Sequence, residues 1–244
     1  MPSTLLELQA AGEVWRHAPV DVAVVDDGSS DGTSGAAIAG GAISLRLPYN
    51  LGVGAAVRTG LRFAVEREYD RVVIVDADGQ HDTEGIGALL AALDEGADVA
   101  VGSRFASAAS RYEVGRVRRG GMRLLASVVR RLVHQPLSDV TSGFRAFDRK
   151  AVEFLAREYP AEYLADTVEV LLKCHAAGFT IVEVPIEMRQ RTGGVPSSRN
   201  VTLLVNYLRL LIGIASWGWR RSLPPRESQR RDAPLRDIPR KETS

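Results

Sequence analysis

The sequence contains a single cysteine, Cys174, in 244 residues. This excludes an intramolecular disulfide and a zinc site built from several cysteines. The formal net charge of +1 gives no bulk electrostatic attraction to nucleic acid, so we expect no nucleic-acid partner. The N-terminal segment has neither the basic start nor the long apolar core of a secretory signal peptide. These absences predict a protein of the reducing cytoplasm.

Short apolar segments alternate with amphipathic segments along most of the chain. Near-continuous apolar strands that alternate with helices predict an α/β domain with a mostly parallel sheet. Residues 135–148 are predicted to form a loop. The predicted strands are 20–25, 42–47, 71–75, 98–101 and 179–188, and the predicted helices are 4–15, 31–40, 53–68, 83–94, 116–134, 151–159 and 166–177.

Near the C-terminus, residues 203–219 are strongly apolar, a little short for a spanning helix, and have Arg209 in their middle. Three interpretations stay open: a helix at the membrane interface, a helix that packs in the core or in a homo-oligomer, and a spanning helix. Residues 222–244 are rich in proline and charge and are predicted to be a disordered tail. The expected organisation is a domain over 1–199, the apolar helix over 200–221 and the tail, with an interfacial helix placing the protein on the inner face of the membrane.

Two clusters of aspartates follow predicted strands, where parallel α/β sheets bind ligands. The first, in "VVDDGSSDGT", also fits turn and helix-capping chemistry, and we expect Asp31 to cap the next helix. In the second, "VDADGQHD", strand alternation places Asp76 and Asp78 on the same side, where like charges repel unless a cation intervenes. With the amide oxygen of Gln80, these oxygens suit Mg²⁺ or Mn²⁺ and a phosphate-bearing ligand.

Further anion-binding groups are expected from arginines in loops. Arg104 in "VGSRF" and Arg145 in "TSGFR" each follow a glycine near the expected ligand edge, and the planar guanidinium matches phosphate oxygens. The stretch "NLGVGAAVRTG" is similar to a dinucleotide-binding loop, but Val57 stands where a third small residue would fall. We interpret it as a glycine-opened helix that packs near the ligand.

Six motifs, in this order, resemble those of the family 2 glycosyltransferases of the GT-A fold, and within that family the dolichol-phosphate-mannose-synthase-like branch. They are "VVDDGSSDGT", "NLGVGAAVRTG", "VVIVDADGQHD", "VGSRF", "DVTSGFRAF" and "EVPIEMRQRTGG". The resemblance implies transfer of a sugar, with inversion, from a nucleotide-diphosphate sugar, helped by Mg²⁺ or Mn²⁺. A polyprenyl phosphate at the membrane surface is one acceptor that it suggests.

The resemblance also implies roles for individual residues. Asp139 matches the acidic residue proposed near the acceptor, which could accept the acceptor's proton or orient it. Asp166 and Glu169 are rival candidates for that base. If the acceptor is already an anionic phosphate, little base catalysis is needed. Arg118, Arg119 or Arg145 would then matter more than the base. The implied metal ligands are Asp76, Asp78 and Gln80, and the implied nucleotide-sugar-binding residues are Val25, Asp27, Asp76, Ala77, Arg104, Arg145 and Arg191.

The sequence departs from the family pattern at two places. No strand with a Pro-x-Tyr-Asn-Glu-Glu-like loop precedes Thr4, and "RTGGVPSSR" replaces the commoner Arg-x-x-Gly-x-Ser-Lys pattern. An alternative hypothesis is therefore a catalytically impaired protein that binds a nucleotide or a partner through a degraded donor pocket. A sugar-nucleotide pyrophosphorylase is a third hypothesis, but its glycine-rich, lysine-bearing loop is not visible.

Overall fold

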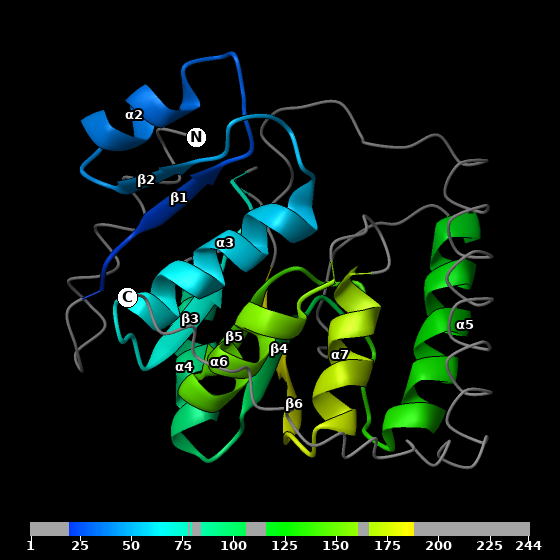
Figure 1. Cartoon of the computed structure of the whole chain (residues 1–244). Helices are drawn as coiled ribbons and strands as arrows, with labels where there is room; N and C mark the ends of the chain where they lie inside the picture. Colours follow the sequence, from blue (N-terminus) through cyan, green and yellow to red (C-terminus); the bar gives the residue numbers. More distant parts are fainter. Residues whose placement is uncertain (1–19, 78, 80–83, 106–115, 161–165, 188–244) are drawn as a thin grey trace, which may run out of the picture.

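A computed structural model describes residues 20–77, 79, 84–105, 116–160 and 166–187 (Figure 1). Strands and helices alternate along most of these ranges, as the sequence periodicity predicts. The apolar segment 203–219, the predicted tail and the predicted helix 4–15 lie outside the described residues. The elements are β1 (Ala23–Asp26), α2 (Thr33–Ala39), β2 (Ile43–Arg46), α3 (Val53–Glu66), β3 (Arg71–Ile74), α4 (Glu84–Asp94), β4 (Val99–Ser103), α5 (Arg116–Val133), β5 (Arg145–Asp148), α6 (Arg149–Glu158), α7 (Asp166–Ala176) and β6 (Ile181–Pro185).

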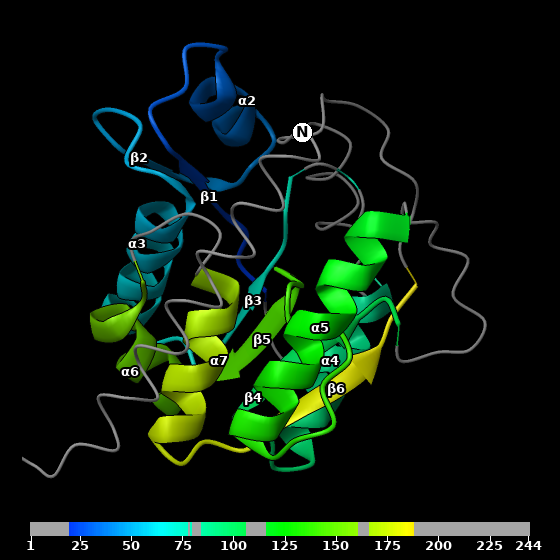
Figure 2. The same cartoon turned by 90° about the vertical axis from the view of Figure 1, so that its right-hand side faces the viewer.

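The described strands form two sheets. β1 and β2 pair in parallel, with Ala23 opposite Ile43 and Asp26 opposite Arg46, and this pair lies with α2 at the upper left of Figure 1. The other four strands form a sheet in the order β3-β5-β4-β6, which Figure 2 shows below the first pair. Within the described ranges no strand joins the two sheets through hydrogen bonds.

Strand β5 corrects the prediction of a loop over 135–148. It runs antiparallel to both β3 and β4, while β4 and β6 are parallel. β3, β4 and β6 therefore run in one direction, and the predicted mostly parallel architecture holds around one reversed strand. The reversed strand, "RAFD", is as short as β3 but has a charged residue at each end, so no apolar run marks it as a strand in the sequence.

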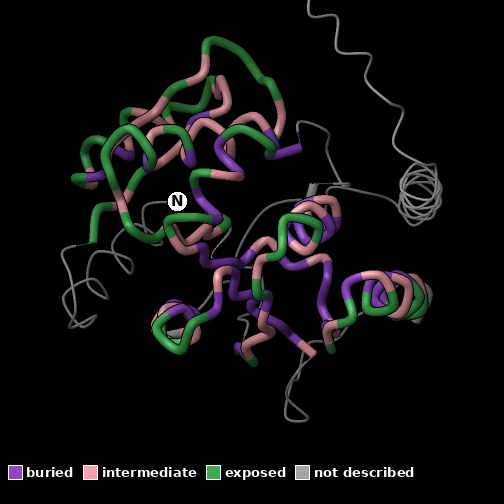
Figure 3. The backbone as a smooth tube through the Cα atoms, turned by 60° about the horizontal axis from the view of Figure 1, so that its bottom comes forward, coloured by how far each residue is buried: buried purple, intermediate pink, exposed green. Residues whose placement is uncertain are grey.

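Helices cover both faces of the four-stranded sheet (Figure 2). On one face α3, α5, α6 and α7 bury a large apolar cluster with the strands. On the other face α4 packs on β4, β5 and β6, and the fully buried ring of Phe144 is part of its cluster. Figure 3 shows that buried segments gather in the middle of the described chain, and every residue of β4 is buried.

None of the described helices is both long and apolar enough to cross a membrane.

Candidate active site

The start of β5 and the ends of β3 and β4 meet at one edge of the sheet. Arg145, the first residue of β5, lies opposite Ile74 of β3 and opposite Val101 of β4. The loop 138–144, which leads into β5, is therefore placed beside the residues that follow the other two strands. This reversal brings "VDA" (75–77), "VGSRF" and "SDVTSGFR" together although they are far apart in the sequence.

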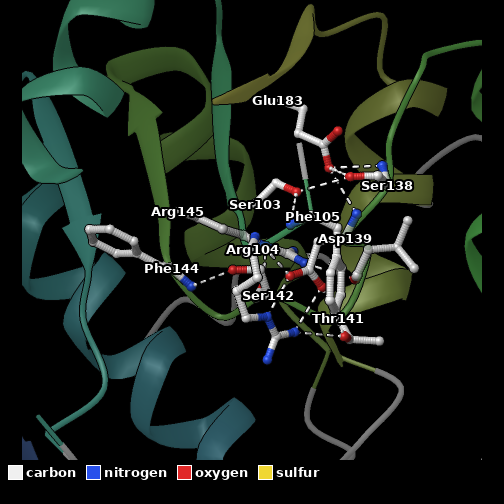
Figure 4. Close-up of polar contacts among 11 residues, drawn as sticks. Ser103, Arg104, Phe105, Ser138, Asp139, Thr141, Ser142, Phe144, Arg145 and Glu183 are labelled. Atoms are coloured by element: carbon white, nitrogen blue, oxygen red, sulfur yellow. Dashed lines mark hydrogen bonds and ion pairs between the residues drawn. The ribbon is translucent and has the colours of Figure 1, made fainter. Parts of the chain in front are cut away.

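An ion pair between Arg104 and Asp139 occupies the centre of this edge (Figure 4). Nε of Arg104 donates to Oδ2 of Asp139 at 2.6 Å, and Nη2 donates to Oδ1 at 2.8 Å. The side chains are almost fully buried, with 10% of Arg104 and 0% of Asp139 exposed. The Arg104 backbone N–H and the Thr141 hydroxyl also donate to the same carboxylate, at 3.3 and 3.1 Å. A bidentate geometry with further hydrogen bonds is what allows two charges to be buried.

The Arg145 guanidinium binds the backbone of the loop that precedes it. Its Nε donates to the carbonyl of Ser142 at 2.8 Å and its Nη2 donates to the carbonyl of Val140 at 3.2 Å. The residue is only 2% exposed. Its observed contacts hold the 138–144 loop in shape, and a direct contact with the nucleotide sugar stays a prediction.

Asp76 follows β3 and is exposed, and its carboxylate lies beside Gly143. A Cβ atom at Gly143 would stand 3.3 Å from Oδ2 and 3.6 Å from Oδ1 of Asp76. The missing side chain of Gly143 therefore leaves the space in which this carboxylate sits. The adjacent Ala77 is also exposed.

Asp78 and Gln80 lie outside the described residues, and the described residues alone contain no group of three His, Cys, Asp or Glu side chains that could hold a metal. Carboxylate and amide oxygens are nevertheless the ligands that Mg²⁺ and Mn²⁺ prefer, and Asp76 supplies one of them at the sheet edge. The described part of the site thus contributes one hard oxygen ligand, from Asp76. The complete ligand set stays a prediction.

In the first aspartate cluster, two carboxylates each bind backbone amides at the start of a helix. Asp27 accepts the amide hydrogens of Leu51 at 2.7 Å and Gly52 at 2.8 Å, at the start of α3. Asp31 accepts the Thr33 amide at 3.1 Å, at the start of α2, although the capping position itself is Gly32. The nucleoside contact predicted for Asp27 stays a prediction.

Asp26, which was not assigned a ligand role, is the buried member of that cluster. The hydroxyl of Ser29 and the hydroxyl of Ser34 donate to it, as does the Ser29 amide. These hydrogen bonds, with the Ser29 hydroxyl first, lower the pKa of Asp26 to about 2. Val25, the neighbouring predicted site residue, is half-buried in β1.

Three other predicted site residues remain. Arg191 lies outside the described residues, as does the side chain of Asp166. Glu169, a rival candidate for the base, pairs with Lys173 at 3.2 Å along α7. It is thus engaged on its own helix.

Sequence reasoning missed Glu183 of β6. Its Oε1 accepts the amide hydrogens of Ser138 and Asp139, both at 2.8 Å, and the Ser138 hydroxyl at 3.0 Å. The Ser138 hydroxyl also lies 3.0 Å from that of Ser103. One signal was available, since Glu183 is an acid inside the apolar strand "IVEVP".

Comparisons with known proteins agree with this arrangement. The model of glycosyl transferase family 2 matches residues 3–155. Polyprenol monophosphomannose synthase from Mycolicibacterium smegmatis is 31% identical over 226 residues, covering 86% of this chain and 80% of that protein. Undecaprenyl-phosphate mannosyltransferase from Micrococcus luteus is 32% identical over 182 residues, covering 71% of this chain and 74% of that protein.

Among solved structures, glucosyl-3-phosphoglycerate synthase from Mycobacterium tuberculosis, in complex with Mn²⁺, uridine diphosphate and glucosyl-3-phosphoglycerate, matches with a TM-score of 0.62. The match covers 88% of this chain and 75% of the synthase chain at 20% identity, which shows a shared fold. Mannosyl-3-phosphoglycerate synthase from Rubrobacter xylanophilus matches with a TM-score of 0.60 at 19% identity, covering 93% of this chain and 73% of that chain. The GT-A expectation is confirmed, and the chain belongs to glycosyl transferase family 2.

Proposed function

We propose that this glycosyltransferase moves a sugar, with inversion, from a nucleotide-diphosphate sugar to a polyprenyl phosphate, with a divalent metal ion as cofactor. The observation that carries the proposal is the state of Asp139. The carboxylate expected to act as the base accepts hydrogen bonds from Arg104 and Thr141 through both of its oxygens. A carboxylate engaged in this way is poorly suited to remove a proton from a neutral hydroxyl acceptor.

A phosphate acceptor removes that requirement, because it already carries the negative charge of a nucleophile. The same preference fits the relatives, whose names specify polyprenol and undecaprenyl phosphate chemistry. An acceptor with a lipid tail would bring the enzyme to the membrane surface, where residues 203–219 supply an apolar segment. The lipid phosphate and the location on the inner face of the membrane are parts of the same proposal.

On the donor side, Asp76 would hold the metal together with Asp78 and Gln80. When bound, the ion neutralises the charge that develops on the leaving nucleoside diphosphate. Mn²⁺ in the solved structure of the mycobacterial synthase supports a divalent ion in this fold. Arg104 stands at the same sheet edge and supplies a fixed guanidinium, while Asp27 and Arg191 are proposed to contact the donor.

The proposal is tested by transfer assays on the full chain. Donor panels of GDP- and UDP-sugars with Mn²⁺ or Mg²⁺ are combined with a polyprenyl phosphate in detergent, and the lipid-linked sugar is measured by mass spectrometry. We expect product with at least one donor and its loss in Asp76→Asn. Asp94→Asn, which alters an exposed ion pair with Arg71, is the matched control and should remain active.

Two other outcomes would redirect the proposal. Transfer to 3-phosphoglycerate, without transfer to the lipid, would assign the acceptor class of the solved structural neighbours. Nucleotide binding by calorimetry without turnover across the whole panel would favour the alternative of a catalytically impaired binding protein.

A further inference from the structure

Glu183 connects β6 to the loop that carries Asp139. Its single oxygen Oε1 accepts two consecutive backbone amide hydrogens, from Ser138 and Asp139, both at 2.8 Å. The Ser138 hydroxyl donates to the same oxygen at 3.0 Å. Two successive N–H groups aimed at one point form an anion-binding concavity, and here a carboxylate of the protein itself fills it.

These amides belong to a loop and not to a helix or a strand. Half-buried backbone donors need a partner, and Glu183 is that partner. A hydrogen bond to an ionised acceptor is roughly twice as strong as one between neutral groups. The position of the backbone at Ser138 and Asp139 is therefore set to a large extent by a residue of another strand.

The side chain of Asp139, whose backbone amide binds Glu183, binds Arg104. Figure 4 shows the Glu183 carboxylate at the amides of Ser138 and Asp139, and the Asp139 carboxylate facing Arg104. Glu183 lies opposite Val101 in the parallel pairing of β6 with β4, and Arg104 follows that same β4. Asp139 is therefore held at two points, its carboxylate by Arg104 just after β4 and its backbone amide by Glu183 of β6.

We infer that Glu183 is a positioning residue for the proposed transfer reaction, acting through Asp139 to set where the Arg104 guanidinium stands. This effect requires no contact between Glu183 and the substrate. A buried ion pair tolerates little displacement, because its attraction repays the desolvation of both charges only in a close geometry. A displacement of about 1 Å in a group that positions substrate can cost about 100-fold in rate.

The experiment compares Glu183→Met, which removes the acceptor oxygen at similar length, with Glu183→Gln, which keeps an oxygen at Oε1 and removes only the charge. Glu153→Met, which removes an exposed partner of Arg149 on α6, is the matched control. In the full chain we measure hydrogen exchange of the peptide that covers 137–144, affinity for Mn²⁺ with the nucleoside diphosphate, and kcat/KM for transfer.

In Glu183→Met we expect faster exchange over 137–144, weaker binding of the nucleoside diphosphate with Mn²⁺ because Arg104 is a predicted donor contact, and a loss in kcat/KM of about 10- to 100-fold, in the range seen when supporting hydrogen bonds of a site are removed. Glu183→Gln should recover most of that loss. Combined with Arg104→Ala, Glu183→Met should cause little further loss in kcat/KM, because both changes act on the Arg104 guanidinium.

Losses that multiply in the double variant would overturn the inference, since Glu183 would then act independently of Arg104. So would wild-type exchange and wild-type kcat/KM in Glu183→Met. The inference rests on the proposed function, but the two fail separately. If the wild-type protein transfers no sugar, the proposed function fails, whereas the exchange measurement still decides whether Glu183 holds the loop.

Discussion

Removing Asp139 while Arg104 stays in place is expected to destabilise the fold strongly. The carboxylate is fully buried and the arginine side chain nearly so, so Asp139→Leu leaves a buried positive charge without its counter-ion. Breaking one side of a buried pair costs about 3–5 kcal/mol. The Arg104 backbone amide also loses its acceptor, at 3.3 Å in the intact protein. For a chain of this size, such a loss lowers Tm by roughly 6–20 °C.

Replacing both partners with apolar residues gives a different result. In Arg104→Met/Asp139→Leu no charge is buried, so most of the lost stability should return, and pairs of this kind are often neutral or even stabilising by about 1–4 kcal/mol. Transfer activity should remain strongly reduced, because the guanidinium is gone. The double variant therefore separates the role of the pair in folding from its role in the reaction.

The assay is thermal and urea unfolding of the wild type, the two single variants and the double variant at neutral pH. The ion-pair reasoning would be refuted by a Tm of Asp139→Leu within about 3 °C of wild type, which corresponds to roughly 1 kcal/mol. It would also be refuted by a double variant no more stable than Asp139→Leu.

Three further predictions concern neighbouring features. Gly143→Ala should weaken Mn²⁺ binding by about tenfold in calorimetry, because the new methyl group would stand 3.3 Å from the Asp76 carboxylate; unchanged affinity would separate the loop from the metal site. Gly102→Ala should cost about 1–3 kcal/mol in urea unfolding, since its Cβ would come within 2.9 Å of a buried aromatic ring. Hydrogen bonds, first from the Ser29 hydroxyl, lower the pKa of Asp26 from 3.8 to about 2, so the stability it contributes is complete above about pH 4 and is lost as the pH falls toward 2. Ser29→Ala should flatten that pH dependence in urea titrations, and an identical pH profile would contradict the assignment.

The alternation of elements could be predicted because each long element carries its own period. Helices α3 and α5 and strands β3 and β4 begin and end within a few residues of the predicted bounds. β5 could not be predicted in this way. Its order between β3 and β4 is set by pairing with strands that lie about 40 and 70 residues away in the chain, and local pattern does not record such pairing.

The candidate site was predicted as a set of residues and not as a set of contacts. Arg104 and Asp139 were each identified, but the ion pair between them spans 35 positions and depends on the reversed strand. Glu183 was overlooked because one acid in a short apolar strand reads as a solvent-facing position. The charged groups were therefore visible in the sequence, whereas their neutralisation by one another was not.

That neutralisation bears on which arginines are predicted to meet an anionic acceptor. Arg104 is balanced by Asp139, and the guanidinium of Arg145 is buried against the carbonyls of its own loop. The other two acceptor candidates, Arg118 and Arg119, belong to the first turn of α5, a turn without an acidic residue, and their side chains lie outside the described part of the chain. Arg118→Ala and Arg119→Ala should raise KM for the polyprenyl phosphate about tenfold, the effect of about 1.4 kcal/mol of lost binding, while KM for the donor stays constant. Arg130→Ala, in the last turn of the same helix, is the matched control. A change in donor KM alone would place these arginines on the nucleotide side. Other residues would then have to bind the acceptor phosphate.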